Sequence, residues 1–288
     1  PGHSAPPRPI LSAAVRPAWV RGAAIVAEGY GRSMDDSFRA AVRALLVPAG
    51  ELALSYFGRV DRESKPDGTP VTEADRMVEE ALVGAIERQF PGESVFSEEG
   101  HIVTGRAGAP SWYVDPIDGT GAFLSQLSYW GPTVCRVVDG RLQSGGLYVP
   151  RLGEFWYGED GGGAWRDDRR LAPVEPTELR GDDVLFVPSR FHRRQPAPWP
   201  GKIRALGSSA CHLAHVAAGG GMATIIPKWS LWDVGCGTVL IREVGRVIWG
   251  PSGVPLEPER DGPDRPFLAG APVALRQLTD DRWPGWGR

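Results

Sequence analysis

Apolar residues recur at helical spacing in two segments near the start of the chain. Residues 33–58 predict one helix, interrupted or kinked at Pro48, because proline lacks an amide hydrogen and clashes with the preceding turn. A second helix is predicted to end at about Gln89, before a Pro-Gly pair. Its start is marked by Thr72, since Thr72 followed three positions later by Asp75 resembles a capping box with Thr72 as the N-cap.

Short apolar runs bounded by glycine, proline or acidic residues indicate strands in the rest of the chain. The predicted strands cover residues 94–96, 112–114, 133–138, 145–149, 154–157, 184–187 and 223–226. Two further helices are predicted at 209–218 and 234–244. Because strands and helices alternate through both halves, we expect a layered α/β or α+β fold.

The composition is that of a globular protein with a core, since 42% of the 288 residues are hydrophobic and 23% are charged. The 32 basic and 35 acidic residues give a formal charge of −3, which favours neither nucleic acid nor a membrane surface as a partner. No run of about 18 apolar residues is present, so no membrane span is predicted. The three cysteines lack CxxC spacing, which argues against a disulfide framework or zinc knuckle and favours a reducing cytoplasm.

Positive charge is concentrated in one segment, residues 190–204. Its basic residues are Arg190, Arg193, Arg194, Lys202 and Arg204. Such a run is usually a solvated loop, but it can also contact an anionic substrate or a partner subunit. Both interpretations are open at the level of the sequence.

The segment 112–120 carries the most informative acidic pair of the chain. An apolar strand leads into Asp115 and Asp118, with Pro116 stiffening the backbone between them and Gly119 permitting a close approach. Hard cations such as Mg²⁺ prefer oxygen ligands, which two aspartates and a backbone carbonyl supply. The amides after Asp118 are expected to open a helix, where free N–H groups favour a phosphate.

Two further acidic segments complete a candidate constellation. Glu98 and Glu99 follow a predicted strand, and Asp233 is expected to cap the last predicted helix. Each acid alone has an ordinary interpretation, as an exposed side chain or a helix cap. Carboxylates that converge from separate segments with little positive charge nearby repel each other unless cations neutralise them. Their combination therefore predicts a metal site.

The chain is predicted to divide into three parts. Residues 1–32 are rich in Pro, Ala and Arg without the apolar core of a signal peptide, so we expect a partly ordered extension. Pro, Glu and Asp accumulate near 175–185. We expect an N-terminal α+β subdomain with the metal site over 33–180, and a C-terminal α/β subdomain that completes the site over 181–288.

Three blocks of the sequence resemble the inositol monophosphatase superfamily of lithium-sensitive, Mg²⁺-dependent phosphatases. They are residues 65–75, the Glu98-Glu99 pair with 115–120, and Trp232-Asp233 with the glycines that follow. The segment Gly207-Ser208-Ser209-Ala210 is similar to the turn on the family's substrate side, and the resemblance spans roughly residues 35–250. It implies an alternating αβαβα sandwich of the inositol monophosphatase and fructose-1,6-bisphosphatase type, and a homodimer.

The resemblance also implies the ligands of two metal ions. Glu98, Asp115 and the carbonyl of Ile117 would hold the first ion, and Asp115, Asp118 and Asp233 the second. Two or three Mg²⁺ ions and inhibition by Li⁺ are expected on this basis. A metal lowers the pKa of a bound water and offsets charge on the phosphoryl oxygens, so no covalent phosphoenzyme is required.

Catalytic and substrate-binding residues follow from the same resemblance. Glu98 and Thr120 would orient the attacking water, with Asp75 behind Thr120. Backbone amides of Gly119 and Thr120 would bind the phosphate. The substrate-binding candidates are Gly119, Thr120, Gly207, Ser208, Ser209 and Lys228.

The sequence departs from the family pattern in two places. Gly121-Ala122-Phe123 lacks the Asn that the family usually carries after the threonine. Ile226 stands seven residues before Asp233, where inositol phosphatases carry a Glu that binds sugar hydroxyls. An isoleucine cannot read hydroxyls, so inositol monophosphate is not favoured as the substrate. Lys228 and Trp229 either favour an anionic or flat substrate or merely pack and face solvent.

The expected activity is hydrolysis of a small phosphate monoester of a sugar, cyclitol, amino-alcohol or nucleoside. Histidinol-phosphate phosphatase is an alternative within the same family, whereas no second-phosphate pocket of a bisphosphate nucleotidase can be identified. A catalytically silent binder of metal or phosphate is an alternative of another class. His212 and His215 lie three positions apart on a predicted helix, but no carboxylate accompanies them to make a metal site.

Overall fold

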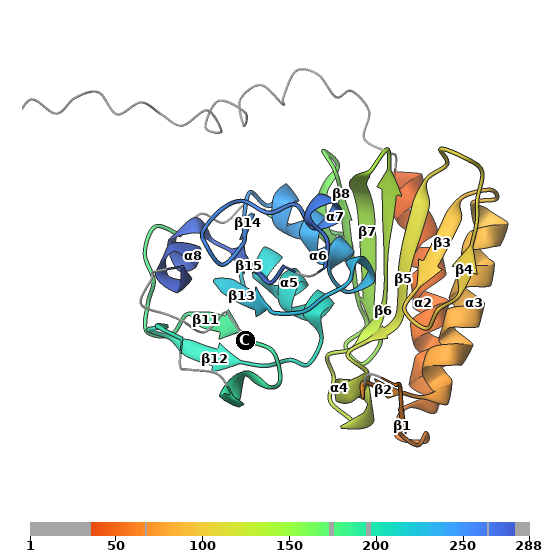
Figure 1. Cartoon of the computed structure of the whole chain (residues 1–288), viewed down its shortest axis with the longest axis horizontal. Coiled ribbons are helices and arrows are strands. Elements are labelled where there is room, and N and C mark those ends of the chain that lie inside the picture. The colour runs from red at the N-terminus through yellow and green to blue at the C-terminus, as the bar shows by residue number, and fades with distance from the viewer. Residues whose placement is uncertain (1–35, 67, 173–175, 194–196, 264, 280–288) are drawn as a thin grey trace, which may run out of the picture. The chain divides into compact units, whose positions relative to one another are not determined.

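The computed structural model describes residues 36–279, apart from 67, 173–175, 194–196 and 264. The chain divides into two units, Pro1–Ser33 and Met34–Arg288, and the described residues all belong to the second. The predicted extension over 1–32 and Arg194 lie outside the described residues. Figure 1 shows the elements of the second unit.

Two long helices, α2 (Asp36–Tyr56) and α3 (Glu73–Gln89), form the first layer. The predicted capping box is present at α3, where Thr72 Oγ1 accepts from Asp75 N (3.4 Å) and Asp75 Oδ2 accepts from Thr72 N (2.7 Å). The predicted interruption at Pro48 is wrong, because α2 continues through it. Apolar residues on both sides of Pro48, such as Leu46 and Ala53, are fully buried, so packing sustains the helix despite the lost hydrogen bond.

An eight-stranded sheet forms the second layer, with α2 and α3 against one face. Its strands run in the order β10-β9-β8-β7-β6-β5-β3-β4, and the β3–β5 pair is parallel while the other pairs are antiparallel. The strands are β3 (Ser94–Ser97), β4 (Ile102–Val103), β5 (Ser111–Asp118), β6 (Gly131–Val138), β7 (Arg141–Val149), β8 (Glu154–Glu159), β9 (Gly163–Arg166) and β10 (Arg169–Arg170). A separate hairpin, β1 (Glu63–Ser64) and β2 (Pro70–Val71), precedes α3.

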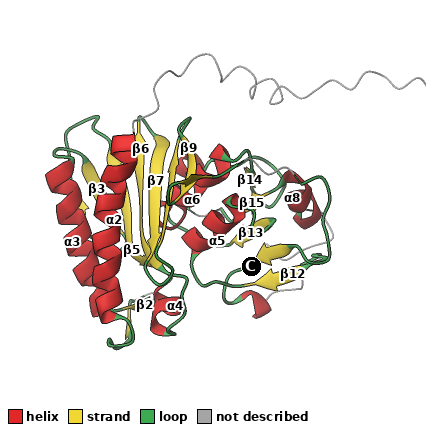
Figure 2. Cartoon of the chain, turned by 180° about the vertical axis from the view of Figure 1, so that it is seen from behind, coloured by secondary structure: helices red, strands yellow, loops and turns green. Residues whose placement is uncertain are grey.

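Helices α5 (Ser209–Ala217) and α6 (Leu231–Glu243) pack together on the other face of this sheet (Figure 2). Glycines allow α6 to approach closely, since a Cβ on Gly145 of β7 would lie 2.4 Å from Cys236 Cα. The predicted capping role of Asp233 is wrong in detail, because Ser230 is the N-cap of α6 and Asp233 lies at the third helical position. Asp233 Oδ2 accepts from Ser230 N (2.6 Å) in a second capping box.

A five-stranded sheet, in the order β12-β11-β13-β15-β14, forms the next layer. Its strands are β11 (Val184–Phe186), β12 (Lys202–Arg204), β13 (Ala223–Ile226), β14 (Val247–Trp249) and β15 (Phe267–Gly270). Helix α5 packs on β13 and β15, and α8 (Pro272–Leu278) also packs on β15, so the layers alternate as αβαβα. The remaining helices are the short α4 (Thr120–Leu124), η2 (Phe191–Arg193) and α7 (Pro258–Asp261).

The predicted boundary near residue 180 falls between the last strand of the large sheet, β10, and the first strand of the small sheet, β11. The division into two subdomains stays a prediction. In the described part of the chain, no helix is both long and apolar enough to span a membrane.

Candidate metal centre and active site

Strand β5 carries both aspartates of the central motif. The strand was expected to end before Asp115, but it continues to Asp118, with a register shift against β6 between these two residues. In a regular strand, residues three apart face opposite sides of the sheet. The register shift around Pro116 breaks this alternation, and both carboxylates are buried. Helix α4 opens directly afterwards, as the sequence predicted.

Three carboxylates from different elements converge at one point. One oxygen each of Glu98, Asp115 and Asp233 lies within 4.8 Å of the other two. Glu98 follows β3, Asp115 belongs to β5 and Asp233 to the first turn of α6. Burial raises the pKa of Asp115 well above its usual value, and the charges of Glu98, Asp118 and Asp233 raise it further. Burial and the charges of Asp118 and Glu98 likewise raise the pKa of Asp233.

Such a donor set fits a divalent cation. Hard carboxylate oxygens are the ligands that Mg²⁺ prefers, and a cation at this point would offset the repulsion that raises these pKa values.

Asp118 is held by the N-terminus of α5. Its Oδ2 accepts from the Ser208 hydroxyl and from Ala210 N (2.7 Å), and its Oδ1 accepts from Ser209 N at 3.3 Å. Burial raises the pKa of Asp118 to about 6, although these hydrogen bonds lower it. Asp118 thus joins β5 to α5 at the edge of the three-carboxylate group. Its role as a metal ligand stays a prediction.

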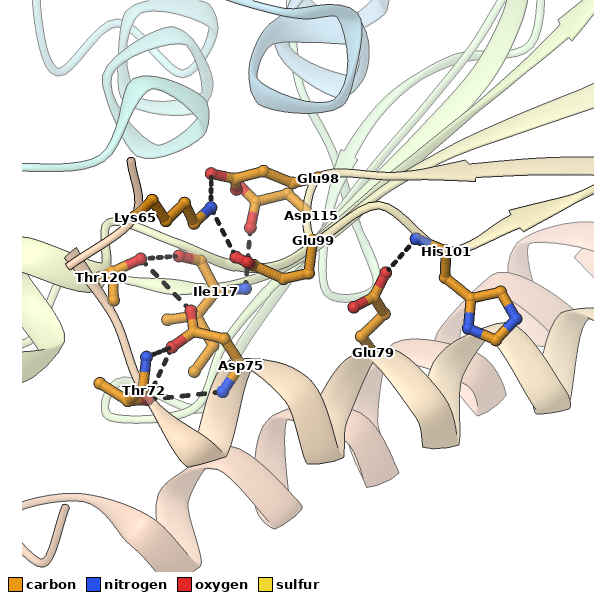
Figure 3. A network of polar contacts seen from close by, with 10 residues as sticks. All are labelled: Lys65, Thr72, Asp75, Glu79, Glu98, Glu99, His101, Asp115, Ile117 and Thr120. Atoms are coloured by element: carbon orange, nitrogen blue, oxygen red, sulfur yellow. Dashed lines mark hydrogen bonds and ion pairs between the residues drawn. The ribbon is translucent and has the colours of Figure 1, made fainter. Parts of the chain in front are cut away.

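Thr120 and Asp75 form the predicted pair beside the carboxylates (Figure 3). Thr120 Oγ1 lies 3.3 Å from Asp75 Oδ1 and 3.2 Å from the carbonyl oxygen of Ile117. Asp75 Oδ2 accepts from the amide and hydroxyl of Thr72 (2.7 and 2.6 Å), so the other oxygen is fixed toward Thr120. Burial raises the pKa of Asp75. The Ile117 amide donates to Asp115 Oδ1 at 2.8 Å, which ties the metal-site strand to the same turn.

Lys65 is a site residue to which the sequence reasoning gave no role. Its Nζ lies 2.8 Å from Glu98 Oε1 and 2.7 Å from Glu99 Oε1 (Figure 3). Burial alone would lower the pKa of Lys65, but the two carboxylates raise it above its usual value. Burial raises the pKa of Glu99 to about 7 against the lowering effect of Lys65. The sequence feature that could have identified Lys65 is its position at the start of residues 65–75, the first block that resembles the family.

Two cavities adjoin at Lys228. The first, of about 320 Å³, is lined by Lys65, Glu98, Asp233 and Lys228 among others. The second, of about 190 Å³, is lined by the turn 207–209, Ile226 and Lys228 among others. The predicted substrate turn and the predicted metal ligands therefore border neighbouring cavities.

Gly119 lies between the metal-site strand and the substrate turn. Its φ of 95° is left-handed, and a Cβ there would lie 3.1 Å from Ser208 Cβ and 3.3 Å from Gly207 O. Only glycine combines this conformation with so close an approach. Phosphate binding by the amides of Gly119 and Thr120 stays a prediction.

Comparison with known proteins agrees with this geometry. A family model described as the inositol monophosphatase family matches residues 34–284. The chain belongs to the inositol monophosphatase family. The predicted family and the predicted enzyme class, a phosphoric monoester hydrolase, are confirmed.

Named relatives in the family differ in substrate. The chain is 32% identical over 219 residues to a fructose-1,6-bisphosphatase/inositol-1-monophosphatase of Thermotoga maritima, covering 73% of this chain and 83% of the relative. It is 32% identical over 207 residues to a histidinol-phosphatase of Chlorobaculum parvum, covering 68% and 79%. A solved structure of a Thermotoga maritima IMPase superposes with a TM-score of 0.74 at 27% identity, covering 85% and 96%. The layered αβαβα fold class is thereby confirmed.

The position at which the resemblance implied a hydroxyl-binding Glu is apolar in this chain. Ile226 ends β13, is 1% exposed and lines the second cavity. Trp229 packs as a core residue: its Nε1 donates to Arg265 O at 2.8 Å, and its ring meets the Phe267 ring edge-on. Trp229 is 3% exposed, so the packing interpretation applies to it rather than stacking on a flat substrate. Lys228, in contrast, is exposed.

His212 and His215 contact aromatic rings around α5, and neither belongs to the group of three converging carboxylates. His212 stacks on Phe186, and His215 meets Trp156 and Tyr129 edge-on. Burial lowers the pKa of His212 to about 3 and that of His215 to about 4. Both rings are therefore neutral packing groups at physiological pH.

Proposed function

We propose that this chain hydrolyses a small phosphate monoester in a Mg²⁺-dependent reaction at the site built from β5, α4 and α6. The observation that carries the proposal is the convergence of Glu98, Asp115 and Asp233 beside the Thr120–Asp75 pair. The family membership supports the reaction class. The variety of substrates among the named relatives leaves the alcohol part of the ester to be determined from this chain's own cavities.

Two or three Mg²⁺ ions are the cofactor that we propose. Glu98, Asp115 and the carbonyl of Ile117 would hold the first ion, and Asp115, Asp118 and Asp233 the second. Bound there, the ions would supply charge neutralisation and acidify a coordinated water. Competition by Li⁺ is expected at the same oxygens, so inhibition by Li⁺ is part of the proposal.

The chain's own groups would position the reactants. Thr120 Oγ1, fixed between Asp75 Oδ1 and the carbonyl oxygen of Ile117, would hold the attacking water together with Glu98. Asp75 would accept a hydrogen bond from the Thr120 hydroxyl, which leaves the lone pairs of Thr120 Oγ1 free to accept a hydrogen bond from the water. Amides of Gly119 and Thr120 would bind the phosphoryl oxygens, and Gly207, Ser208, Ser209 and Lys228 would border the alcohol part.

The test is a phosphate-release assay with Mg²⁺ over a panel of small phosphomonoesters. Wild type is expected to release phosphate from at least one of them, and Asp233→Asn to reduce release by about 100-fold or more, because it removes a negative charge from the metal centre. Asp168→Asn is the matched control, since Asp168 is 91% exposed and its ion pair with Arg43 is on the surface. Release that is equal in the two variants contradicts the proposal.

Histidinol phosphate is a second candidate substrate. The observation in its favour is the 32% identity to the histidinol-phosphatase of Chlorobaculum parvum. Histidinol phosphate belongs in the same panel. Its hydrolysis in preference to the phosphate monoesters of hydroxycarboxylates and polyols would establish it as the substrate. A panel on which nothing is hydrolysed would instead favour a silent binding protein.

A cytoplasmic location and a homodimer complete the proposal. Cys135, Cys211 and Cys236 are free and buried, which is compatible with a reducing compartment. Sedimentation equilibrium tests the dimer directly, with a mass of twice 31.1 kDa as the expected result.

A further inference from the structure

Lys228 is a cation placed between the two cavities of the site. It lines the cavity that contains Glu98 and Asp233 and also the cavity bordered by the turn 207–209. Its side chain makes no ion pair with any residue that the structure describes. A lysine ammonium on the wall of a concave site is available to an anionic group of a ligand.

The second cavity combines an apolar wall and three serines with a single cation, Lys228, among the described residues that line it. Ile225, Ile226, Pro188 and Pro227 make its apolar wall, and of the described residues that line it none is Asp or Glu. His212 also lines it, with Nε2 accepting from Leu206 N at 2.9 Å, so this ring is neutral. Sugar hydroxyls would meet an isoleucine where a hydrogen-bonding carboxylate would be needed.

Further positive charge lies along the chain next to this cavity. Ser189 lines it, and Arg190 and Arg193 follow in a turn closed by the hydrogen bond from Arg193 N to Arg190 O (3.0 Å). Arg204 precedes the turn at Gly207, which also lines the cavity. All three arginines are exposed, and none makes an ion pair with a described carboxylate. These arginines add positive charge to the segments that lead into the cavity lining, which makes the local potential more favourable to anions.

We propose that the second cavity binds the alcohol part of a phosphomonoester that carries a carboxylate, and that Lys228 pairs with this carboxylate. The inference rests on the proposed phosphatase function and names its substrate class. Hydrolysis would add one water and yield a hydroxycarboxylate and inorganic phosphate.

A carboxylate fits better than a second phosphate or an amine. One ammonium matches one negative charge, and a cavity of about 190 Å³ with an apolar wall suits a short carbon chain. A second phosphate carries nearly two charges, and among the described residues that line the cavity Lys228 is the one cation, so such a phosphate would be only partly neutralised. The ammonium group of an amino alcohol would be repelled by Lys228, and no described residue of the cavity lining offers a carboxylate to pair with it. Histidinol phosphate is therefore disfavoured.

The experiment compares 3-phosphoglycerate with glycerol 1-phosphate, which differ only by a carboxylate in place of a CH₂OH group. We expect wild type with Mg²⁺ to favour 3-phosphoglycerate by about tenfold or more in kcat/KM, the range of a charge-assisted hydrogen bond. Lys228→Gln is expected to bring the ratio close to one, and Lys228→Glu to reverse it. Arg276→Gln is the matched control, because it removes one positive charge from an exposed position of α8, which contributes no described residue to either cavity, and should leave the ratio as in wild type.

The outcomes separate the two proposals. If wild type hydrolyses glycerol 1-phosphate and 3-phosphoglycerate with equal kcat/KM, and Lys228→Gln leaves this ratio unchanged, the inference is overturned while the phosphatase function stands. Preference for propane-1,3-diol bisphosphate or for histidinol phosphate over 3-phosphoglycerate also overturns it. If no ester releases phosphate, the proposed function itself fails, and the inference with it.

Discussion

At the scale of single residues, the site combines buried acids with one well-placed hydroxyl. Thr120 interacts mainly with two neighbouring groups in the described part of the chain, since its Oγ1 lies within hydrogen-bond distance of Asp75 Oδ1 and of the carbonyl oxygen of Ile117. Its removal should therefore affect the water without disturbing the three carboxylates.

Thr120→Val is expected to reduce kcat by about 100-fold, within the range of a positioned proton acceptor or donor. Thr120→Ser keeps the hydroxyl and should retain most of the activity. Mg²⁺ affinity, measured by calorimetry, should be unchanged in both variants. An equal loss of activity in the serine and valine variants would contradict the role of the hydroxyl.

His215 makes a residue-scale prediction about acid stability. Burial and the charge of Arg166 lower the pKa of His215 to about 4 in the folded protein, against 6.5 for the free side chain. The unfolded chain then binds more protons between these values, so this residue's contribution makes stability fall as pH falls through 6.5 toward 4. The full contribution is roughly 3.5 kcal/mol, from about 1.4 kcal/mol per pKa unit.

Urea unfolding at pH 7.5 and 5.0 tests this contribution. His215→Asn should be less stable than wild type at pH 7.5, because it loses the ring contacts with Trp156 and Tyr129. The variant should nevertheless lose less stability on acidification. An identical loss in wild type and variant would show that His215 does not titrate as described. His192→Asn, on an exposed turn, controls for removing one histidine.

At the scale of elements, Ser208 joins the metal-site strand to the substrate helix. Its Oγ donates to Asp118 Oδ2 and accepts from Cys211 N at 3.0 Å, so one hydroxyl caps α5 and positions β5. Ser208→Ala should lower the free energy of unfolding by about 1–2 kcal/mol, the usual effect of losing an N-cap. Ser209→Ala should have a smaller effect, because Ser209 donates to Asp118 through its backbone amide only. Urea titrations of the two variants should therefore differ.

The approach of α6 to the large sheet is a second element-scale feature. Gly145→Ala would place a Cβ 2.4 Å from Cys236 Cα, a backbone atom that cannot move without shifting α6. We expect destabilisation of about 1–3 kcal/mol or more and weaker Mg²⁺ binding, because α6 also carries Asp233. Gly181→Ala is the control, since no atom lies within 4 Å of its Cβ position. Thermal unfolding that is equal in both variants would contradict this account of the packing.

Sequence patterns predicted the elements with strong periodicity and missed those set by packing. The capping box of α3 was readable from Thr72 and Asp75, and the same Ser-x-x-Asp spacing at Ser230 could have placed the start of α6 correctly. Strands of two or three residues, such as β4 and β14, are too short to show a period. Continuation of β5 through Pro116 contradicts the usual preference of proline, and only the pairing with β6 reveals it.

At the scale of the whole second unit, the site combines residues from different layers that are far apart in the sequence. Glu98 and Asp115 come from the large sheet and Asp233 from the helix layer between the sheets. Local periodicity could not predict that these residues lie close together. Only the resemblance to a family predicted it. The resemblance gave no role to Lys65, because the ion pairs of Lys65 with Glu98 and Glu99 follow from how the chain packs around the carboxylates.

The most direct test of this arrangement is calorimetric titration of the full chain with Mg²⁺ at pH 7.5 in the absence of substrate. Wild type and Asp168→Asn should bind Mg²⁺ alike, whereas Asp115→Asn, which removes a charge from the centre of the group, should weaken binding by at least about tenfold. Circular dichroism of each variant verifies the fold. Undiminished Mg²⁺ binding by a folded Asp115→Asn protein would contradict the claim that these three carboxylates form the metal centre.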